Sequence, residues 1–323
     1  GVVYNEMKGA FSSPDEVLER EIMNHLFPDT TYGCESGGDP KNIPDLTYEN
    51  FLNFHRTYYH PSNSYIYLYG NMDMEEKLAF LDEHYLSHFD YLDVDSVIQE
   101  QKAFGACRDV TLEYPVAENE GEEDNTYLSY NMVVGNAADS QMAMAFEVLD
   151  YALLSAPGAP LKQALLDVKA GKDVYGSYDD GILQPYFTVI AKGSNPDRKE
   201  EFVSVIRQVL GDIVKNGIDR KAVEAGINYF EFRYREADFS SYPKGLMYGL
   251  QCLDSWIYDE KEPFMHIEAI ETYAFLKEQT KGRYFEELVQ KYLLDNTHVS
   301  VVITKPQKGL NAENEKALEE KLA

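Results

Sequence analysis

The sequence predicts an α+β protein made of two related two-layer domains, whose mostly antiparallel sheets are covered by helices. Predicted strands cluster with helices without strict strand–helix–strand alternation. The chain has 323 residues, of which 44% are hydrophobic, and this length suits roughly two domains with buried cores. The runs "RTYYHPSNSYIYLYG" and "QKYLLDNTHVSVVITKP" share a helix end, a short turn and an alternating strand, which indicates an internal repeat. We therefore expect a first domain in residues 1–105, a second in 106–310, and a charged helical segment in 311–323.

The first domain is predicted to be mainly helical. Ser13 and Glu16 form a capping box with Pro14 at the first helical position, so a helix begins there and carries Leu18, Ile22 and Leu26 on one face. A second helix begins after Thr47 and ends before Pro61, with Phe51, Phe54 and Tyr58 as its apolar face. Alternation in "NSYIYLYGN" predicts a strand over 63–71, and an amphipathic helix follows over 74–89.

The second domain is predicted to open with a hairpin. The alternating runs "RDVTLEYPV" and "TYLSYNMVVG" flank the acidic loop "ENEGEED", which places Val110, Leu112 and Tyr114 on the inner face. Two further strands are joined through Asp180 and Gly181, and "HVSVVITKP" is the last strand. Helical periodicity predicts helices over 139–155, 160–170, 196–216, 220–237, 245–258 and 265–294.

Charge and cysteine usage limit the classes of partner. The net charge is 29 minus 56, or −27, which disfavours nucleic acids and anionic membranes and would attract basic peptides. No apolar run approaches the roughly 20 residues of a membrane span. The three cysteines are scattered without metal-site spacing. These features favour a reducing, bacterial-type cytoplasmic location, with an organelle as the alternative.

One acidic residue stands out near the start of the chain. In "GVVYNEMKGAF", Val2, Val3 and Met7 fall at helical spacings that define an apolar face, and Glu6 lies within or beside that face. A carboxylate in such a place must be paired with a cation, bind a metal, or have a raised pKa. A salt-bridged or snorkelling glutamate is the alternative to a metal ligand.

Several longer stretches resemble one protein family. "GVVYNEMKGAFSSPDEVL", "TYGCESGGDPKNIPDLT", "FHRTYYHPSNSYIYLYG", "FRYREADFSSYPKGL" and "SWIYDEKEPF" are similar to the presequence-protease branch of the pitrilysin/insulinase zinc metallopeptidases. The resemblance covers nearly the whole chain, in order. It implies a zinc endopeptidase whose two halves enclose short unstructured peptides.

The resemblance also assigns a role to Glu6. In that family an HxxEH motif supplies two histidine ligands and a glutamate base. The third zinc ligand is a glutamate further along the chain, within a V-x-N-E-M-K-G motif. The resemblance places this glutamate at Glu6. This chain departs from the pattern, because its histidines, at 25, 55, 60, 84, 88, 266 and 298, form no HxxEH. The family pattern would place that motif before Gly1, so we expect an internal fragment without catalytic residues of its own. Residues 311–323 would then start the hinge to the other half of the same polypeptide.

Two expectations follow for function. The first is that the chain contributes the zinc ligand Glu6 and a chamber wall to a peptidase, and by itself neither retains zinc nor cleaves peptides. The second is that the chain comes from a metal-free relative that acts as a structural or peptide-binding subunit. Retention of Glu6 in its motif favours the first, because a metal-free protein has no need of that carboxylate.

Overall fold

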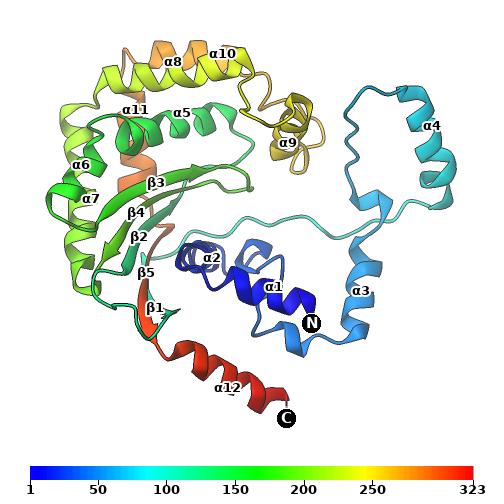
Figure 1. Cartoon of the computed structure of the whole chain (residues 1–323). Coiled ribbons are helices and arrows are strands. Elements are labelled where there is room, and N and C mark those ends of the chain that lie inside the picture. The colour runs from blue at the N-terminus through cyan, green and yellow to red at the C-terminus, as the bar shows by residue number, and fades with distance from the viewer. Residues whose placement is uncertain (323) are drawn as a thin grey trace.

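A five-stranded sheet organises the computed structural model of the chain, which describes residues 1–322 (Figure 1). The strand order is β1-β5-β2-β4-β3. The pair β1–β5 is parallel, and the pairs β5–β2, β2–β4 and β4–β3 are antiparallel. The strand bounds are β1 Arg108–Val116, β2 Thr126–Val133, β3 Asp173–Asp179, β4 Tyr186–Ser194 and β5 Val299–Lys308. The predicted α+β class with a mostly antiparallel, helix-covered sheet is confirmed.

The predicted hairpin between β1 and β2 is wrong, because β5 lies between these two strands. Val110 pairs with Val302 of β5, and Tyr130 of β2 pairs with Val301 on the other side of β5. The alternation of β1 is nevertheless as expected, with Val110, Leu112 and Tyr114 less exposed than their neighbours. The two strands are close in the sequence, which favoured the hairpin. However, β5 has apolar side chains on both of its faces, so it is the better central strand.

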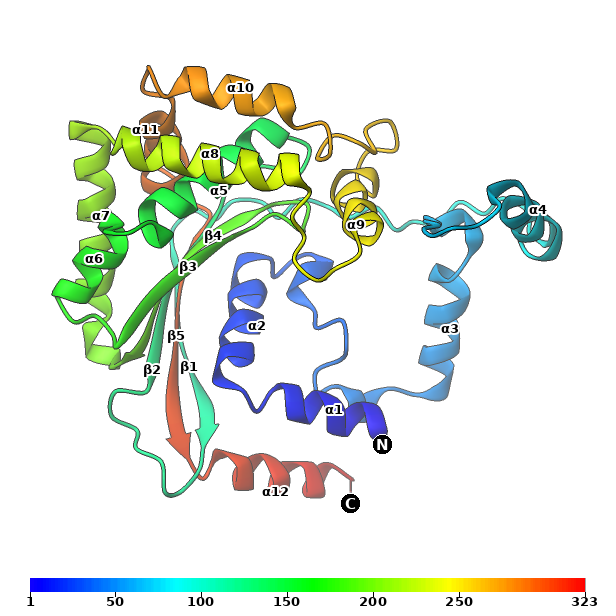
Figure 2. The same ribbon diagram turned by 45° about the horizontal axis from the view of Figure 1, so that its top comes forward.

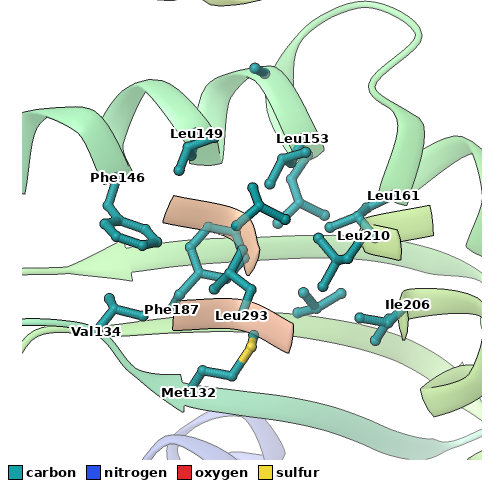
Figure 3. Close-up of a cluster of buried hydrophobic side chains, with 14 of the residues drawn as sticks. Met132, Val134, Phe146, Leu149, Leu153, Leu161, Phe187, Ile206, Leu210 and Leu293 are labelled. Carbon is teal, nitrogen blue, oxygen red and sulfur yellow. The ribbon is translucent and has the colours of Figure 1, made fainter. Parts of the chain in front are cut away.

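The main core lies between one face of the sheet and a layer of helices (Figure 3). Leu128, Tyr130 and Met132 alternate along β2 toward this core, where they meet Phe146 and Leu149 of α5. The helices of this layer include α5 Ser140–Asp150, α6 Pro160–Asp167, α7 Lys199–Asn216, α8 Arg220–Glu236, α10 Ile270–Gln279 and α11 Tyr284–Leu288. The helix predicted over 265–294 is therefore interrupted, since the turn at Thr280 to Gly282 separates α10 from α11.

Two of these helices end in wider π-turns. Residues Tyr151–Ser155 continue α5 and residues Val289–Leu294 continue α11 in this form. The remaining α-helix of residues 106–310 is α9 Lys244–Trp256, and α12 Leu310–Leu322 follows β5. Within residues 1–322 no helix combines the length and apolarity that crossing a membrane requires.

The opposite face of the sheet is covered by α2 Pro14–Leu26, which comes from the first 105 residues (Figure 2). Leu18, Ile22 and Leu26 are 2%, 3% and 0% exposed and belong to a second core that includes Val302 and Ile190 of the sheet. This face also carries a buried polar pair: Ser129 donates to the Val302 carbonyl at 3.0 Å, and Asn131 donates to Ser129. The sheet thus depends on α2 to exclude water from its second face.

A polar contact fixes the start of α2 on the same face. The Asp15 carboxylate accepts hydrogen bonds from Lys192 Nζ at 3.0 and 3.1 Å, from Tyr127 at 3.2 Å and from Tyr175 at 3.3 Å. These three donors lie on three neighbouring strands. Asp15, in the first turn of α2, therefore anchors the helix across the sheet. The helix begins at Pro14 as expected, but the capping box predicted at Ser13 and Glu16 is wrong, because the Ser13 side chain makes no cap hydrogen bond.

The other elements of the first 105 residues are exposed. They are α1 Val2–Ala10, α3 Tyr48–Tyr58 and α4 Met74–His84. The predicted cap is confirmed, since Thr47 and Asn50 form a reciprocal capping box. However, the apolar face of α3 is uncovered within residues 1–322, with Phe51 and Phe54 at 66% and 60% exposure.

The strand predicted over 63–71 is wrong for the described residues. Residues 64–69 lie outside any assigned strand, and the sheet contains only β1 to β5. A strand requires a hydrogen-bonding neighbour, which the part of the chain described here does not supply. The similar run that forms β5 has β1 and β2 beside it, so the same local signal gives a strand there.

We predict that Leu18→Ala destabilises the chain by about 2–5 kcal/mol, because it leaves a cavity between α2 and the sheet. Leu46→Ala is the matched control: Leu46 is 67% exposed, so its truncation should cost less than about 0.5 kcal/mol. Urea unfolding followed by far-UV circular dichroism measures both. Equal losses for the two variants would show that α2 does not pack on the sheet.

Candidate functional site

Glu6 lies in the middle of α1 and its side chain is exposed. Val2 and Val3, which were expected to share a covered apolar face with it, are 74% and 58% exposed, and α1 has no buried residue. The expectation that Glu6 sits in a covered apolar face is therefore wrong for residues 1–322. The physical reason is that no described element packs over this side of the helix.

The other side of α1 contacts the loop 35–40 and helix α12. A Cβ atom added to Gly37 would lie only 2.4 Å from the Met7 sulfur, so the glycine is what allows α1 to seat on the loop "ESGGDP". Gly38 next to it has φ +93°, a conformation that favours glycine. On the flank of α1, Lys8 Nζ lies 2.8 Å from Glu315 of α12. Met7 thus places α1 on the loop, whereas the exposed Lys8–Glu315 pair adds little, and neither contact provides Glu6 with a partner.

A second group of contacts joins α1, α2 and the glycine loop. The Arg20 guanidinium lies 4.1 Å from the centre of the Phe11 ring, 2.8 Å from Glu21 and 3.5 Å from Asp39. The Arg20 side chain is only 14% exposed, which makes this pairing more persistent than a surface ion pair. The sequence gives no sign of this cluster, since spacing along the chain does not bring residues 11, 20 and 39 together.

The residues present do not complete a metal site. A catalytic zinc takes about three protein ligands, and among residues 1–322 no group of three histidine, cysteine, aspartate or glutamate side chains is placed to hold an ion. Glu6 offers one carboxylate. His84 and His88, which are four residues apart, lie at the end of α4 and in the turn Leu86–His88 that follows. The assignment of Glu6 as a ligand thus stays a prediction.

Three carboxyl groups with raised pKa values gather near the turn between β3 and β4. Burial raises the pKa of Glu147 to about 8, and the charge of Asp180 adds to the shift while Arg233 opposes it. Burial also raises the pKa of Asp254 to about 7, helped by Asp180 and Asp179. Burial also raises the pKa of Asp180, and His266 opposes this shift. These groups affect the pH dependence of stability and were not foreseen from the sequence, which does not reveal burial.

Comparison with known proteins places the chain in a family. Residues 45–230 match the family described as "Peptidase M16 inactive domain". The chain is 47% identical over 322 residues to protein HypA of Clostridium perfringens, covering 100% of this chain and 33% of that protein. The chain belongs to the pitrilysin/insulinase, or M16, peptidase family. The predicted family is thereby confirmed.

Further relatives agree with this assignment. The chain is 36% identical to presequence protease 1, chloroplastic/mitochondrial, of Arabidopsis thaliana, over 95% of this chain and 29% of that protein. The chain thus spans about a third of the length of these relatives. Among solved structures, a protease from Helicobacter pylori has the same fold, with a TM-score of 0.71 and 16% identity over 94% of this chain and 70% of its own.

We predict that Glu147→Gln stabilises the chain at pH 8. The pKa of Glu147 is higher in the folded chain than in the unfolded chain. The contribution of its neutral carboxyl to the free energy of unfolding is therefore fully present below about pH 4.5 and is lost as the pH rises toward 8. Glutamine removes the ionisation, and the gain at pH 8 should be about 1 to 3 kcal/mol for this partly exposed side chain. Thermal unfolding at pH 5 and pH 8 measures the difference.

Glu224→Gln, at an exposed position on α8, is the control and should show no such difference between the two pH values. A gain for Glu147→Gln that is the same at both pH values would contradict the prediction.

Proposed function

We propose that the chain forms part of a zinc-dependent endopeptidase that degrades short unstructured peptides. The observation that carries the proposal is the 36% identity, over 95% of the chain, to a presequence protease. In this proposal Glu6 is the third zinc ligand, residues 106–310 form a wall of the peptide chamber, and the remaining parts of the polypeptide supply the HxxEH motif and the opposing half.

The geometry around Glu6 supports this role. Glu6 is exposed, and no ion pair within residues 1–322 involves it, so its carboxylate is available. At the same time the seating of Met7 on Gly37 orients the helix, while the exposed Lys8–Glu315 pair adds little to this. An available donor on a fixed backbone is the arrangement that a preorganised ligand requires.

A second function is supported by one specific observation. The family that matches residues 45–230 is described as an inactive domain, and this chain contains no HxxEH. A metal-free structural or peptide-binding subunit would show both features. The discriminating observation is whether the full-length protein carries the HxxEH motif.

The cytoplasmic location is likewise part of the proposal, and the three free cysteines are compatible with it.

The zinc assignment is tested in the full-length protein. We expect peptidase activity that a chelator removes and added zinc restores, and we expect Glu6→Gln to lower the bound zinc per protein by at least about tenfold, because it removes one of about three ligands. The matched control is Glu16→Gln, an exposed residue on α2. Metal analysis after gel filtration is the readout. Full zinc content in Glu6→Gln would reject Glu6 as a ligand, and activity without metal would reject the zinc peptidase.

The 323-residue chain alone gives a complementary test. We expect it to bind zinc more weakly than about micromolar and to cleave no peptide, since a lone carboxylate is a poor zinc site. Micromolar affinity by calorimetry that is lost in Glu6→Gln would contradict this expectation.

The acidity of the chain suggests which peptides the parent prefers. With a net charge of −27, it should attract basic peptides, and this attraction should be screened by salt. We expect kcat/KM of the full-length enzyme for a basic peptide to fall several-fold between about 50 and 500 mM salt, while a neutral peptide of equal length changes little. The same salt response for both peptides would remove charge from the account of specificity.

A further inference from the structure

The extended segment 64–69 and helix α9 form a contact whose residues are complementary. Tyr65, Tyr67 and Tyr69 alternate along the segment, so their side chains share one face. On α9, Gly245, Gly249 and Trp256 also share one face, because they follow helical spacing. We refer to these three tyrosines as the tyrosine row and to the three α9 residues as the glycine face.

Each tyrosine of the row meets one position of the glycine face. A Cβ atom added to Gly245 would lie 1.8 Å from the Tyr69 ring, and one added to Gly249 would lie 2.4 Å from the Tyr67 ring. Tyr67 also donates a hydrogen bond of 2.6 Å from its hydroxyl to the Gly245 carbonyl. At the far end, the rings of Tyr65 and Trp256 meet edge to face, with centroids 4.6 Å apart. The two glycines are therefore what lets the rings lie on the helix backbone.

Helix α9 contributes no side chain to the hydrophobic core of residues 106–310, although its Asp254 lies near Asp179 and Asp180 of the β3–β4 turn. Its buried residues are Gly249, Cys252 and Ser255, all small, and none of its residues belongs to either hydrophobic core of the described chain. Loops flank α9 on both sides. The loop before it, 237–243, contains Ala237 and Ser240 with φ of 48° and 55°, and the loop after it covers residues 257–269.

A second contact with the first 105 residues lies just after α9. The hydroxyl groups of Tyr258 and Tyr32 are 2.6 Å apart, and Tyr32 also accepts a hydrogen bond from the Leu183 amide. The α9 region is thus held at Gly245, at Trp256 and at Tyr258 by tyrosines from residues 1–105. The loop 257–269 is joined to the core by polar contacts, from Tyr234 to the Ile267 carbonyl at 2.9 Å and between His266 and the Ala137 carbonyl, also at 2.9 Å.

We propose that α9, although encoded within residues 106–310, is held in place by the tyrosine row and moves with the segment 64–69. The loops 237–243 and 257–269 then separate α9 from the body formed by the sheet, its helical layer and α2. Loss of the tyrosine row should release α9 while the sheet and its helical layer stay folded. This inference does not depend on the proposed peptidase function.

The test uses hydrogen exchange together with Trp256, which is the only tryptophan of the chain. In the triple variant Tyr65→Ala, Tyr67→Ala, Tyr69→Ala, we expect amide exchange in residues 244–256 to rise at least about tenfold. Quenching of Trp256 fluorescence by acrylamide should rise as well. Protection of β2, β4 and β5 should be unchanged, and this also verifies that the variant is folded.

The matched control is Tyr48→Ala, Tyr59→Ala, Tyr91→Ala, which removes three tyrosines of the same part of the chain that are 76%, 69% and 83% exposed. It should leave α9 unaffected. Protection of α9 that stays the same after loss of the tyrosine row would show that the second domain holds this helix, and would overturn the proposal.

Glycine substitutions test the same contact from the helix side. Gly211 of α7 has no atom near its would-be Cβ, so Gly211→Ala should lower amide exchange in α7, by up to about fivefold, through helix propensity alone. Gly249→Ala should displace the Tyr67 ring and increase the quenching of Trp256 despite the same propensity gain. If Gly249→Ala instead lowers both quenching and exchange in α9, the close packing of Tyr67 on this helix is refuted.

Discussion

The burial of α2 against the sheet is the interaction on which the rest of the structure depends. The sheet has apolar side chains on both faces, and its own helices cover only one of them. Leu18, Ile22 and Leu26 exclude water from the other face, and each such side chain contributes about 1.5–3 kcal/mol when fully buried. Asp15 then fixes the helix across three strands. Because α2 also meets α1 and the glycine loop through Arg20, its docking determines where Glu6 lies relative to the sheet.

The position of β5 shows why local patterns were insufficient for topology. The strands β1, β2 and β5 were all recognised from the sequence, but the hairpin rule joined the wrong pair, and β2 is buried at every residue rather than on alternate ones. The strand between β1 and β2 comes from residues 299–308, far along the chain. The opposite outcome occurs at 64–69, where the same signal forms no strand because the described residues provide no neighbour. In both cases the deciding factor is the hydrogen-bonding partner rather than the segment.

The candidate site was predictable in part. The resemblance singled out Glu6 and the glycine loop, and the structure shows why the glycines matter, since Met7 lies directly over Gly37. The apolar face that helical periodicity predicts on α1 is exposed within residues 1–322, because such a face is covered only if another element packs on it. The raised pKa values of Glu147 and Asp254 depend on burial by distant segments, as does the Arg20 cluster, and neither leaves a signal in the local sequence.

By itself the sequence determined the class of the protein, the family, most of the helices, the capping box at Thr47 and the inner face of β1, because these follow from local spacing, capping chemistry and recognisable motifs. Only the tertiary structure decided the strand order, the use of α2 as the cover of a sheet in residues 106–310, and the seating of Tyr67 on Gly249. These features join residues that are distant in the chain, and they are selected by shape and by the exclusion of water. Such selection acts between surfaces, and a surface exists only once the chain has folded.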